Sequence, residues 1–456
     1  MPKDKHLSTI KLLNTGHFLL TIMSFFLVWM RNVDLGRSEA RYYIYVAGLY
    51  GVLVFFLDRT YNAYLVGYMS VGDMAYSQSL SVFLSTAAVY ALTALAWTRL
   101  YNPVPYLLLL AGQIAFNVFW SHFITWVYFR WIPARKTLVI YRHDDDLLRV
   151  EEIRENPRMF RLEAFVCEAE LGDEPMKTVE QFEAVFAVGI DPELRNQIAQ
   201  FCVEKNIQGC FLPDAGDVIL SGAKHIQSYS VPVMNVERKM PQPEFLFIKR
   251  TFDIVASLLG IILISPFMLI TALAIKLYDR GPVFYTQVRL TKDGKHFNIL
   301  KFRSMKVDAE GDGVARLTTE HDDRITPVGR VIRAVRMDEI PQLFNILKGD
   351  MSIVGPRPDR PEIAAQYAEQ FPAFDLRLQV KAGLTGYAQV YGRYNTDPHD
   401  KLQMDLMYIN RMGIFTDLIL IVGTLRILFV KESTSGIREG NITASVSEGR
   451  EEKEQS

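Results

Sequence analysis

An uncharged apolar run from Ile254 to Ile275 constrains the fold of this chain most, because it is long enough to cross a bilayer as one helix. Ser265 and Pro266 interrupt the run at its middle, and a proline inside a helix bends or breaks it. The Ser265 hydroxyl can bond a backbone carbonyl that the break frees. Basic residues flank both ends of the run: Lys249, Arg250, Lys276 and Arg280. This flanking charge favours two ends on the same membrane face, so we predict a re-entrant helix broken at Ser265 and Pro266, with a kinked spanning helix as the alternative.

Four further apolar segments open the chain, at roughly residues 17–30, 42–57, 78–97 and 105–129. Lysines precede the set and basic residues follow it, which predicts that both of its ends face the cytoplasm. We therefore expect a transmembrane domain of four helices over residues 1–135 and a multi-pass protein of the cytoplasmic membrane. No ionisable pair is evident inside a span, so a transport or proton path is not expected.

Between residues 136 and 243, short β-rich runs alternate with helix-compatible stretches such as Pro192–Lys205. This alternation predicts a cytoplasmic, Rossmann-like α/β domain with a parallel sheet. The first strand is followed by the acidic segment Arg142–Asp146, where a dinucleotide fold would have a glycine-rich turn. We therefore expect an interaction or regulatory module. The three cysteines lie in this region without metal-ligand spacing, as in a reducing cytoplasm.

Residues 244–430 are expected to form a third, mixed α/β domain that includes the re-entrant helix. Two strands are predicted around an Asp293–Gly294 hairpin turn, followed by a polar loop over Val307–Asp323. An amphipathic helix over Phe415–Val430 is expected at the bilayer surface, and a disordered tail over residues 431–456. The fold class is thus a membrane α/β protein with a transmembrane bundle, a central sheet domain and this C-terminal domain.

The adjacent carboxylates Asp338 and Glu339 precede Pro341, a residue tolerated only in the first turn of a helix. Free amides at that helix end would hold Asp338 ionised, as a nucleophile or metal ligand requires. The simpler interpretation is a helix-capping pair. Further carboxylates (Asp350, Asp405) and phosphate-suited cations lie in the same domain: Lys301, Arg303, Arg333, Arg336, Arg357 and Arg393.

This combination of carboxylates and cations in one domain suits metal-assisted phosphoryl transfer, although each cation alone could be a solvated surface residue. A domain attached by a re-entrant helix should act on a lipid with a polar head. The net charge of -1 argues against nucleic acid as a partner.

The run from Asp338 to Pro358, with Gly355-Pro-Arg-Pro at its end, resembles the signature of the bacterial sugar transferases. Further matches follow in order: Lys249–Asp253, Ser265-Pro266, Gly281–Tyr285, Lys301–Met305 and Gly383–Arg393. This resemblance covers residues 244 to 430, and the four spans with a central domain are similar to the long members of the family.

The resemblance implies an undecaprenyl-phosphate sugar-1-phosphate transferase. Asp338 would attack a UDP-sugar, with UDP-glucose or UDP-galactose expected, and release UMP. The polyprenyl phosphate lipid would then take the sugar phosphate, as the first step of exopolysaccharide, capsule or O-antigen synthesis. Asp338 and Glu339 would hold Mg²⁺, or Glu339 would assist the second attack. Five cations would bind phosphate or substrate: Lys301, Arg303, Arg336, Arg357 and Arg393. A second copy of the chain and polysaccharide-assembly proteins are candidate partners.

Two alternatives stay open. An ordinary glycosyltransferase would move the sugar without its phosphate and release UDP. A non-catalytic membrane anchor or regulator of polysaccharide assembly would use its central domain to bind a partner.

Overall fold

The computed structural model of the 456-residue chain describes residues 2–33, 41–144, 146–147, 150, 159–172, 174–226, 233–238, 241–307, 322, 324–392 and 397–427. Three predicted features lie outside these residues in whole or in large part: Arg393, the Val307–Asp323 loop and the 431–456 tail. The chain forms two compact units, Met1–Leu212 and Pro213–Ser456, which are described separately below.

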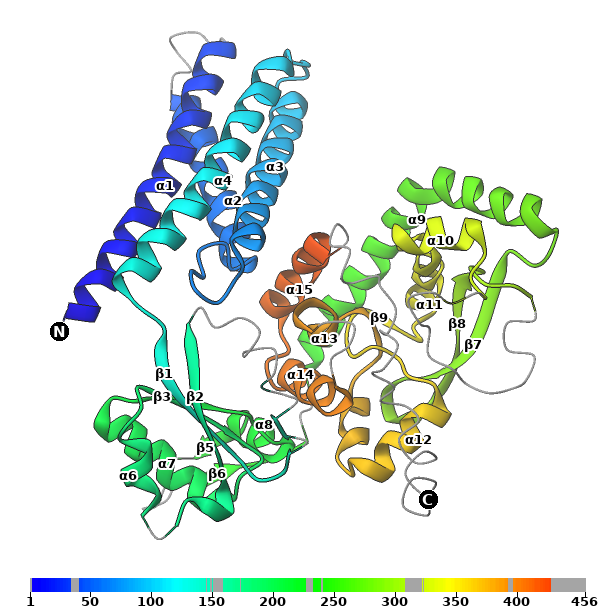
Figure 1. The fold of residues 1–456 in the computed structure, drawn as a ribbon. Helices are drawn as coiled ribbons and strands as arrows, with labels where there is room; N and C mark the ends of the chain where they lie inside the picture. The colour runs from blue at the N-terminus through cyan, green and yellow to red at the C-terminus, as the bar shows by residue number, and fades with distance from the viewer. Residues whose placement is uncertain are drawn as a thin grey trace. The chain divides into compact units, whose positions relative to one another are not determined.

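The first unit begins with a bundle of four helices: α1 (Pro2–Asn32), α2 (Arg41–Thr60), α3 (Val71–Ala96) and α4 (Val104–Trp131) (Figure 1). Each contains a segment long and apolar enough to cross a membrane, as the sequence predicts. Aromatic side chains fill much of the bundle core. Phe25 stacks on Tyr50 with 3.9 Å between ring centroids, and Trp29 is fully buried.

The expectation that the spans hold no ionisable pair is wrong. His17 of α1 and Asp58 of α2 are both buried in the bundle, and both hydrogen-bond to the hydroxyl of Tyr64. Sequence spacing could not bring them together, because they lie on different helices and meet through a residue in the connection after α2.

A four-stranded parallel sheet follows in the order β2-β1-β3-β4: β2 (Phe160–Cys167), β1 (Arg135–Tyr141), β3 (Ala184–Val188) and β4 (Gln208–Phe211). All five residues of β3 are buried, as expected for a strand covered on both faces. Helix α7 (Pro192–Lys205) begins after Asp191, whose side chain accepts the Glu193 N–H. Further short helices described in this part include η2 (Glu168–Glu170) and α6 (Pro175–Val179).

The segment after Leu212 belongs to the second unit, whereas the sequence predicts a boundary near residue 243. It contains α8 (Ala215–Ser221) and the antiparallel pair β5 (Lys224–Ile226) and β6 (Val233–Asn235). Val218 of α8 is buried in the core of the second unit, and its carbonyl accepts a hydrogen bond from Asn410 Nδ2 at 2.6 Å. The division therefore follows tertiary packing, which the composition of this segment does not reveal.

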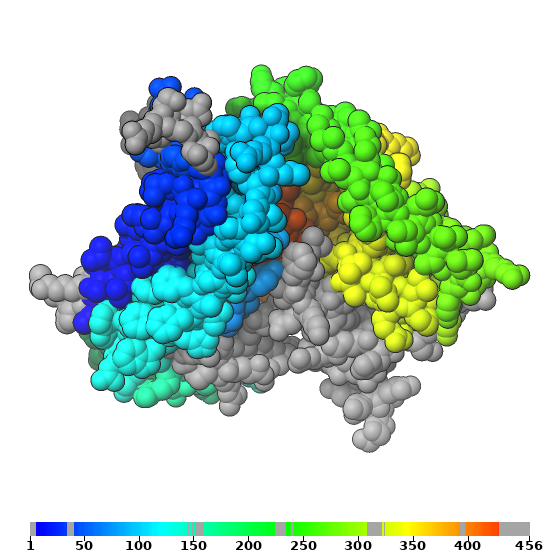
Figure 2. All heavy atoms as spheres, turned by 90° about the horizontal axis from the view of Figure 1, so that it is seen from above, coloured from blue at the N-terminus to red at the C-terminus, as the bar shows by residue number. Residues whose placement is uncertain are grey.

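The long helix α9 (Pro243–Asp279) contains Pro266 and changes direction part-way along (Figure 1). Beside the proline, Ser265 Oγ donates to the carbonyl of Ile262 at 2.8 Å. Leu263 and Leu269 in this middle part are 73% and 72% exposed. In Figure 2, α9 forms a green ridge that no other described segment of its unit covers on that face.

Both ends of α9 contact the same globular fold. Near its N-terminus, Arg250 donates to the carbonyls of Ile346 and Leu347, and Asp253 accepts the Ile353 N–H at 2.9 Å. Near its C-terminus, Ile275 is buried against Phe302 and Ile332 in a separate cluster of the same unit. The apolar middle of α9 therefore leaves this fold and returns to it.

The rest of the second unit combines short helices with two small sheets. Strands β7 (Phe284–Leu290) and β8 (His296–Phe302) pair antiparallel around the turn η3 (Lys292–Gly294), which confirms the predicted hairpin. Strands β9 (Ser352–Val354) and β10 (Gly383–Thr385) pair in parallel. The helices after β8 are α10 (Pro327–Ala334), η4 (Met337–Glu339), α11 (Gln342–Lys348), α12 (Pro361–Gln370), η5 (Phe374–Gln379), α13 (Tyr387–Tyr391), α14 (Pro398–Asn410) and α15 (Ile414–Ile427).

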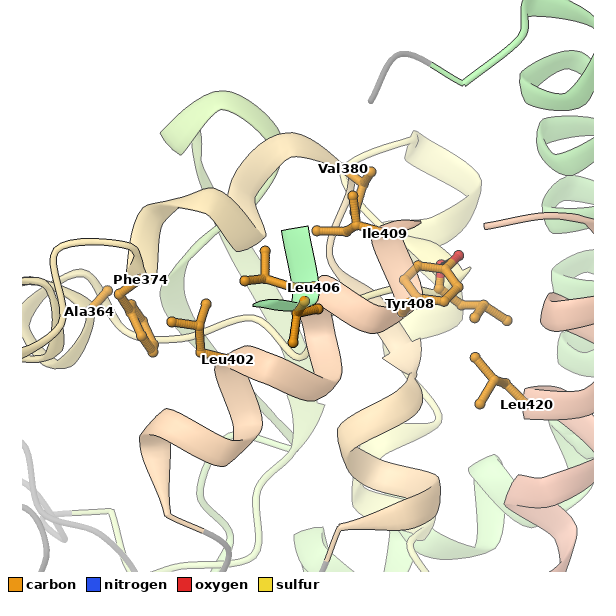
Figure 3. Packing of buried hydrophobic residues seen from close by; sticks show 10 residues of the cluster. Ala364, Phe374, Val380, Leu402, Leu406, Tyr408, Ile409 and Leu420 are labelled. Atoms are coloured by element: carbon orange, nitrogen blue, oxygen red, sulfur yellow. Dashed lines mark hydrogen bonds between the residues drawn. The ribbon is translucent and has the colours of Figure 1, made fainter. Parts of the chain in front are cut away.

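The main core of this unit lies between α12, η5, α14 and α15 (Figure 3). Leu402 and Leu406 of α14 are almost fully buried, and Leu420 of α15 is fully buried. Burial of each such leucine contributes about 1.5–3 kcal/mol. Helix α15, expected to lie on the bilayer surface, thus places one face in the protein core.

A buried ion pair joins α9 to α15. Lys249 Nζ lies 2.6 Å from Asp417 Oδ2, and the hydroxyl of Tyr408 donates to Asp417 Oδ1 at 2.9 Å. The same hydroxyl lies 3.3 Å from the carbonyl of Val354, at the end of β9. The start of the apolar helix is therefore fixed to the strand that leads into the Gly355–Pro358 segment.

Candidate active site

The two carboxylates lie in the short turn η4 (Met337–Glu339), between α10 and α11. Arg336 adopts a left-handed conformation with φ of 53°, which is uncommon for a non-glycine residue and turns the chain after α10. The pair precedes a helix, as the sequence predicts. It stands outside the first turn of α11, however, so the free amides of that helix do not account for the charge of Asp338.

Three cations surround Glu339, whose side chain is only 13% exposed. Arg357 Nη2 lies 2.8 Å and Lys301 Nζ 3.5 Å from Glu339 Oε1, and Arg336 Nη1 lies 3.6 Å from Oε2. Burial by itself would raise the pKa of Glu339, but Arg357, Lys301 and Arg336 outweigh it and hold the pKa well below its usual range. Glu339 is therefore ionised, and it gathers the three cations beside Asp338.

Asp338 has a different environment. No hydrogen bond or salt bridge of its side chain is found within the described part of the chain. Burial raises the pKa of Asp338 and the adjacent Glu339 raises it further, whereas Lys301, Arg333 and Arg357 oppose this shift. The sequence predicts that helix amides keep Asp338 ionised. In the structure, nearby cations instead lower the free-energy cost of ionising it. The carboxylate is available to a substrate.

Arg357 reaches Glu339 from a rigid backbone. Its neighbours Pro356 and Pro358 each fix φ, and two backbone hydrogen bonds of 2.8 Å hold the segment to β10: Gly355 N–H to Thr385 O, and Gly383 N–H to Pro356 O. A Cβ atom on Gly355 would lie 2.3 Å from the Lys381 carbonyl oxygen, so only glycine fits there. The Arg357 side chain is 47% exposed, which leaves part of it open to a ligand.

Arg377 holds the backbone of Arg357 in place, a role that sequence reasoning missed. Its Nη2 donates to the Arg357 carbonyl at 2.8 Å, and its guanidinium forms ion pairs with Asp359 and Asp405. Asp405 is fully buried, so this carboxylate, considered from sequence as a site residue, acts as an anchor. Arg377 stands in Phe374–Val380, where apolar and polar residues alternate without glycine or proline, and no local signal distinguishes it from a surface arginine.

Burial lowers the pKa of Lys301, which the Glu339 carboxylate only partly offsets. Among the other predicted phosphate ligands, Arg303 is placed differently. Its guanidinium is buried, forms a bidentate pair with Asp279 at 2.5 and 2.7 Å, and donates to Pro282 O. Arg303 thus ties the end of α9 to β8, and within the described part of the chain its hydrogen bonds and ion pair go to Asp279 and Pro282 and not to the Glu339 cluster. Arg393 lies outside the described residues.

The predicted metal ligands fit Mg²⁺ only in part. Among the described residues, no group of three histidine, cysteine or acidic side chains could hold a metal ion. The Glu339 charge is already shared by three cations, which would repel a divalent ion beside it. Asp338 fits better, because Mg²⁺ commonly binds through one or two carboxylates and completes its shell with substrate phosphates and water.

Comparison with known proteins places the Glu339 cluster inside a region that other proteins share. Residues 245–431 match the family model described as bacterial sugar transferase, and this range contains every residue of the Glu339 cluster.

Three relatives illustrate the similarity. The UDP-N-acetylgalactosamine-undecaprenyl-phosphate N-acetylgalactosaminephosphotransferase of Aeromonas hydrophila is 42% identical over 190 residues, 41% of this chain and 45% of that protein. The UDP-glucose:undecaprenyl-phosphate glucose-1-phosphate transferase of Escherichia coli (strain K12) is 38% identical over 219 residues, 47% of this chain and 45% of that protein. The exopolysaccharide production protein PSS of Rhizobium leguminosarum bv. phaseoli is 40% identical over 200 residues, 42% of this chain and 98% of that protein. The matched region thus spans about half of the first two relatives and nearly all of the third.

Replacement of Glu339 by glutamine should lower the free energy of unfolding by about 3 kcal/mol, because three partly buried cations lose their common counter-charge. Inorganic diphosphate should recover more stability in this variant than in the unchanged protein, because the anion replaces the carboxylate. Thermal unfolding of the full chain in nanodiscs measures both effects. The exposed Glu362, changed to glutamine, is the matched control. Equal unfolding temperatures for Glu339→Gln and Glu362→Gln, with and without diphosphate, would contradict this account of the cluster.

Proposed function

The chain belongs to the bacterial sugar transferase family, and from this premise we propose that it moves hexose-1-phosphate from a UDP-hexose to polyprenyl (undecaprenyl) phosphate. The observation that carries the proposal is an available Asp338 carboxylate beside cations gathered by Glu339. The names of relatives support a polyprenyl acceptor and a UDP-sugar donor, and they differ in the sugar. UDP-glucose and UDP-galactose are the donors we expect.

In the first step, an Asp338 carboxylate oxygen attacks the phosphorus that bears the sugar. A bond between that oxygen and the phosphorus forms, the bond from phosphorus to the bridging oxygen breaks, and UMP leaves with the bridging oxygen. In the second step, a phosphate oxygen of the lipid attacks the same phosphorus. The bond to Asp338 then breaks, which restores the carboxylate and gives a polyprenyl diphosphate hexose.

The surrounding cations serve both steps by stabilising phosphate oxygens as charge builds up on them. In the free protein, Arg357 and Lys301 both contact Glu339. When the diphosphate binds, both side chains can also interact with its oxygens. Arg336 and Arg333 add positive charge around the carboxylate pair. When bound through Asp338 and the substrate phosphates, Mg²⁺ would supply further charge neutralisation.

We also propose that α9 is re-entrant and keeps this site at the cytoplasmic membrane face, near the lipid head group. The support is geometric: both ends of α9 contact one globular fold, and its apolar middle around Pro266 is exposed. A spanning helix would separate its two ends by the ~30 Å of the bilayer core. The central sheet would then lie in the cytoplasm as a Rossmann-like module, and acidic residues at its carboxyl edge, such as Glu168 and Asp191, argue against a dinucleotide ligand.

Release of UMP from UDP-hexose and polyprenyl phosphate by the purified chain is the expected result. Asp338→Asn should abolish it, whereas Asp375→Asn, a change of the same type in η5, should not. A panel of UDP-glucose, UDP-galactose and their N-acetylated forms identifies the sugar. Release of UDP would support an ordinary glycosyltransferase. An absence of nucleotide release with every donor would support a membrane anchor or regulator of polysaccharide assembly.

The pH dependence should follow Asp338. Protonation removes the attacking carboxylate, so kcat/KM for UDP-hexose should fall with decreasing pH around a midpoint above the ordinary aspartate value of about 3.9. Lys301 lowers the pKa of Asp338, so Lys301→Met should move this midpoint to higher pH in addition to reducing the rate. If the midpoint of the acid limb is the same in Lys301→Met as in the unchanged protein, the group that titrates is not Asp338.

Cysteine labelling tests the membrane arrangement. With Cys167, Cys202 and Cys210 replaced by serine, a cysteine at the exposed position Glu362 should resist an impermeant thiol reagent in intact cells. A cysteine at Arg99, in the connection between α3 and α4, should react from outside. Reaction of both positions would show that α9 crosses the membrane.

A further inference from the structure

The bundle of the first unit holds a buried histidine in a well-defined setting. His17 is 2% exposed, and its ring stacks on both Phe116 and Trp120, with 5.0 Å between centroids in each case. The centroids of those two rings lie 6.1 Å apart, so they do not sandwich the imidazole. Its Nδ1 lies 2.8 Å from the Tyr64 hydroxyl, and its Nε2 lies 3.1 Å from Asn117 Oδ1. Both ring nitrogens have a partner that can accept a hydrogen.

Asp58 is the acidic counterpart of this histidine. It is 5% exposed, and its carboxyl group is hydrogen-bonded to the hydroxyls of Ser81 and Tyr64. Its Oδ1 has no hydrogen-bond partner among the described residues, and no salt bridge to it is found there. An ionised carboxylate among apolar helices is costly without a counter-charge, and intramembrane acidic side chains are commonly functional.

Tyr64 connects the two groups, and the hydrogen positions follow from its neighbours. With Asn117 Oδ1 at 3.1 Å from His17 Nε2, we assign a hydrogen to Nε2. In one arrangement Asp58 is protonated and donates to the Tyr64 oxygen, and the Tyr64 hydroxyl donates to Nδ1. In the other, a doubly protonated His17 donates from Nδ1 to the Tyr64 oxygen, and the hydroxyl donates to the Asp58 carboxylate.

The two arrangements have the same net charge. The first becomes the second when the O–H bond of Asp58 breaks and that hydrogen passes to the Tyr64 oxygen, while the Tyr64 hydrogen passes to Nδ1 and forms an N–H bond. The chain of three side chains thus holds one transferable proton without any net charge among apolar helices. Tyr64, in the connection after α2, is the one member of the three that is partly exposed.

We propose that Asp58, Tyr64 and His17 form a proton-binding relay inside the N-terminal bundle. Each packed element contributes one side chain to it. Helix α1 contributes His17, α2 contributes Asp58, and the connection after α2 contributes Tyr64. Helices α3 and α4 contribute Ser81 and Asn117. Ser81 and Asn117 do not titrate. Tyr50 of α2 is the further titratable group within electrostatic reach of Asp58. Ser77 and Ser85, one turn to either side of Ser81, are buried with hydroxyls unpartnered among the described residues, and they offer sites for water along α3.

The test uses the full chain in nanodiscs with ¹⁵N-labelled histidine, titrated by NMR and by infrared difference spectroscopy. Loss of a signal in His17→Gln assigns the ring of His17, and loss of a carbonyl band in Asp58→Asn assigns the carboxyl of Asp58. In the unchanged protein, the two signals should change together with one midpoint, because loss of the shared proton leaves an ionised Asp58 and a neutral His17. Tyr64→Phe, which preserves the ring but removes the hydroxyl, should separate them into two midpoints.

The control is His122→Gln, a change on the exposed face of α4 that should leave the shared midpoint in place. The relay is overturned if Tyr64→Phe leaves both titrations as they were, or if the His17 ring does not respond to Asp58→Asn. A sodium-dependent rise in Tm that disappears in Asp58→Asn, with the His17 titration unchanged, would overturn it in favour of a metal-cation site. Size-exclusion profiles that match the unchanged protein show that the variants are folded.

Discussion

The charge of Glu339 is the interaction on which the candidate active site depends. Without it, Lys301, Arg336 and Arg357 would repel one another in a partly buried space. With it, the three cations are held next to an aspartate that has no hydrogen bond or salt bridge of its own among the described residues. The adjacent carboxylates therefore have separate tasks: Glu339 organises positive charge, and Asp338 is left available for chemistry.

The same site is tied to the apolar helix by buried polar contacts. Lys249 and Asp253 at the start of α9 reach Asp417 and the backbone of β9, and β9 leads into the segment that carries Arg357. At the other end, Asp279 pairs with Arg303, beside the strand that carries Lys301. Each end of α9 is thus fixed to an element that supplies a cation to the site. Under the proposed function, this arrangement would bring a lipid bound near α9 close to these cations.

Features with a local signal were predictable from sequence. The bounds of α7 agree with the structure, since an Asp-Pro-Glu start defines its beginning. The Asp338–Glu339 pair and the Arg357 segment were recognisable by their prolines and glycines. Long-range contacts were not predictable: Arg377 behind Arg357, the pairing of Arg303 with Asp279, and the meeting of His17 with Asp58 depend on residues distant in sequence.

A single-turnover reaction with UDP-hexose labelled at the sugar-bearing phosphorus, without lipid acceptor, tests the central claim most directly. The account predicts that label remains on the protein, that one equivalent of UMP is released, and that digestion places the label on the peptide with Asp338. Polyprenyl phosphate added afterwards should remove it. Label that stays with small molecules until the lipid is added, and never appears on that peptide, would contradict the role of Asp338 as nucleophile.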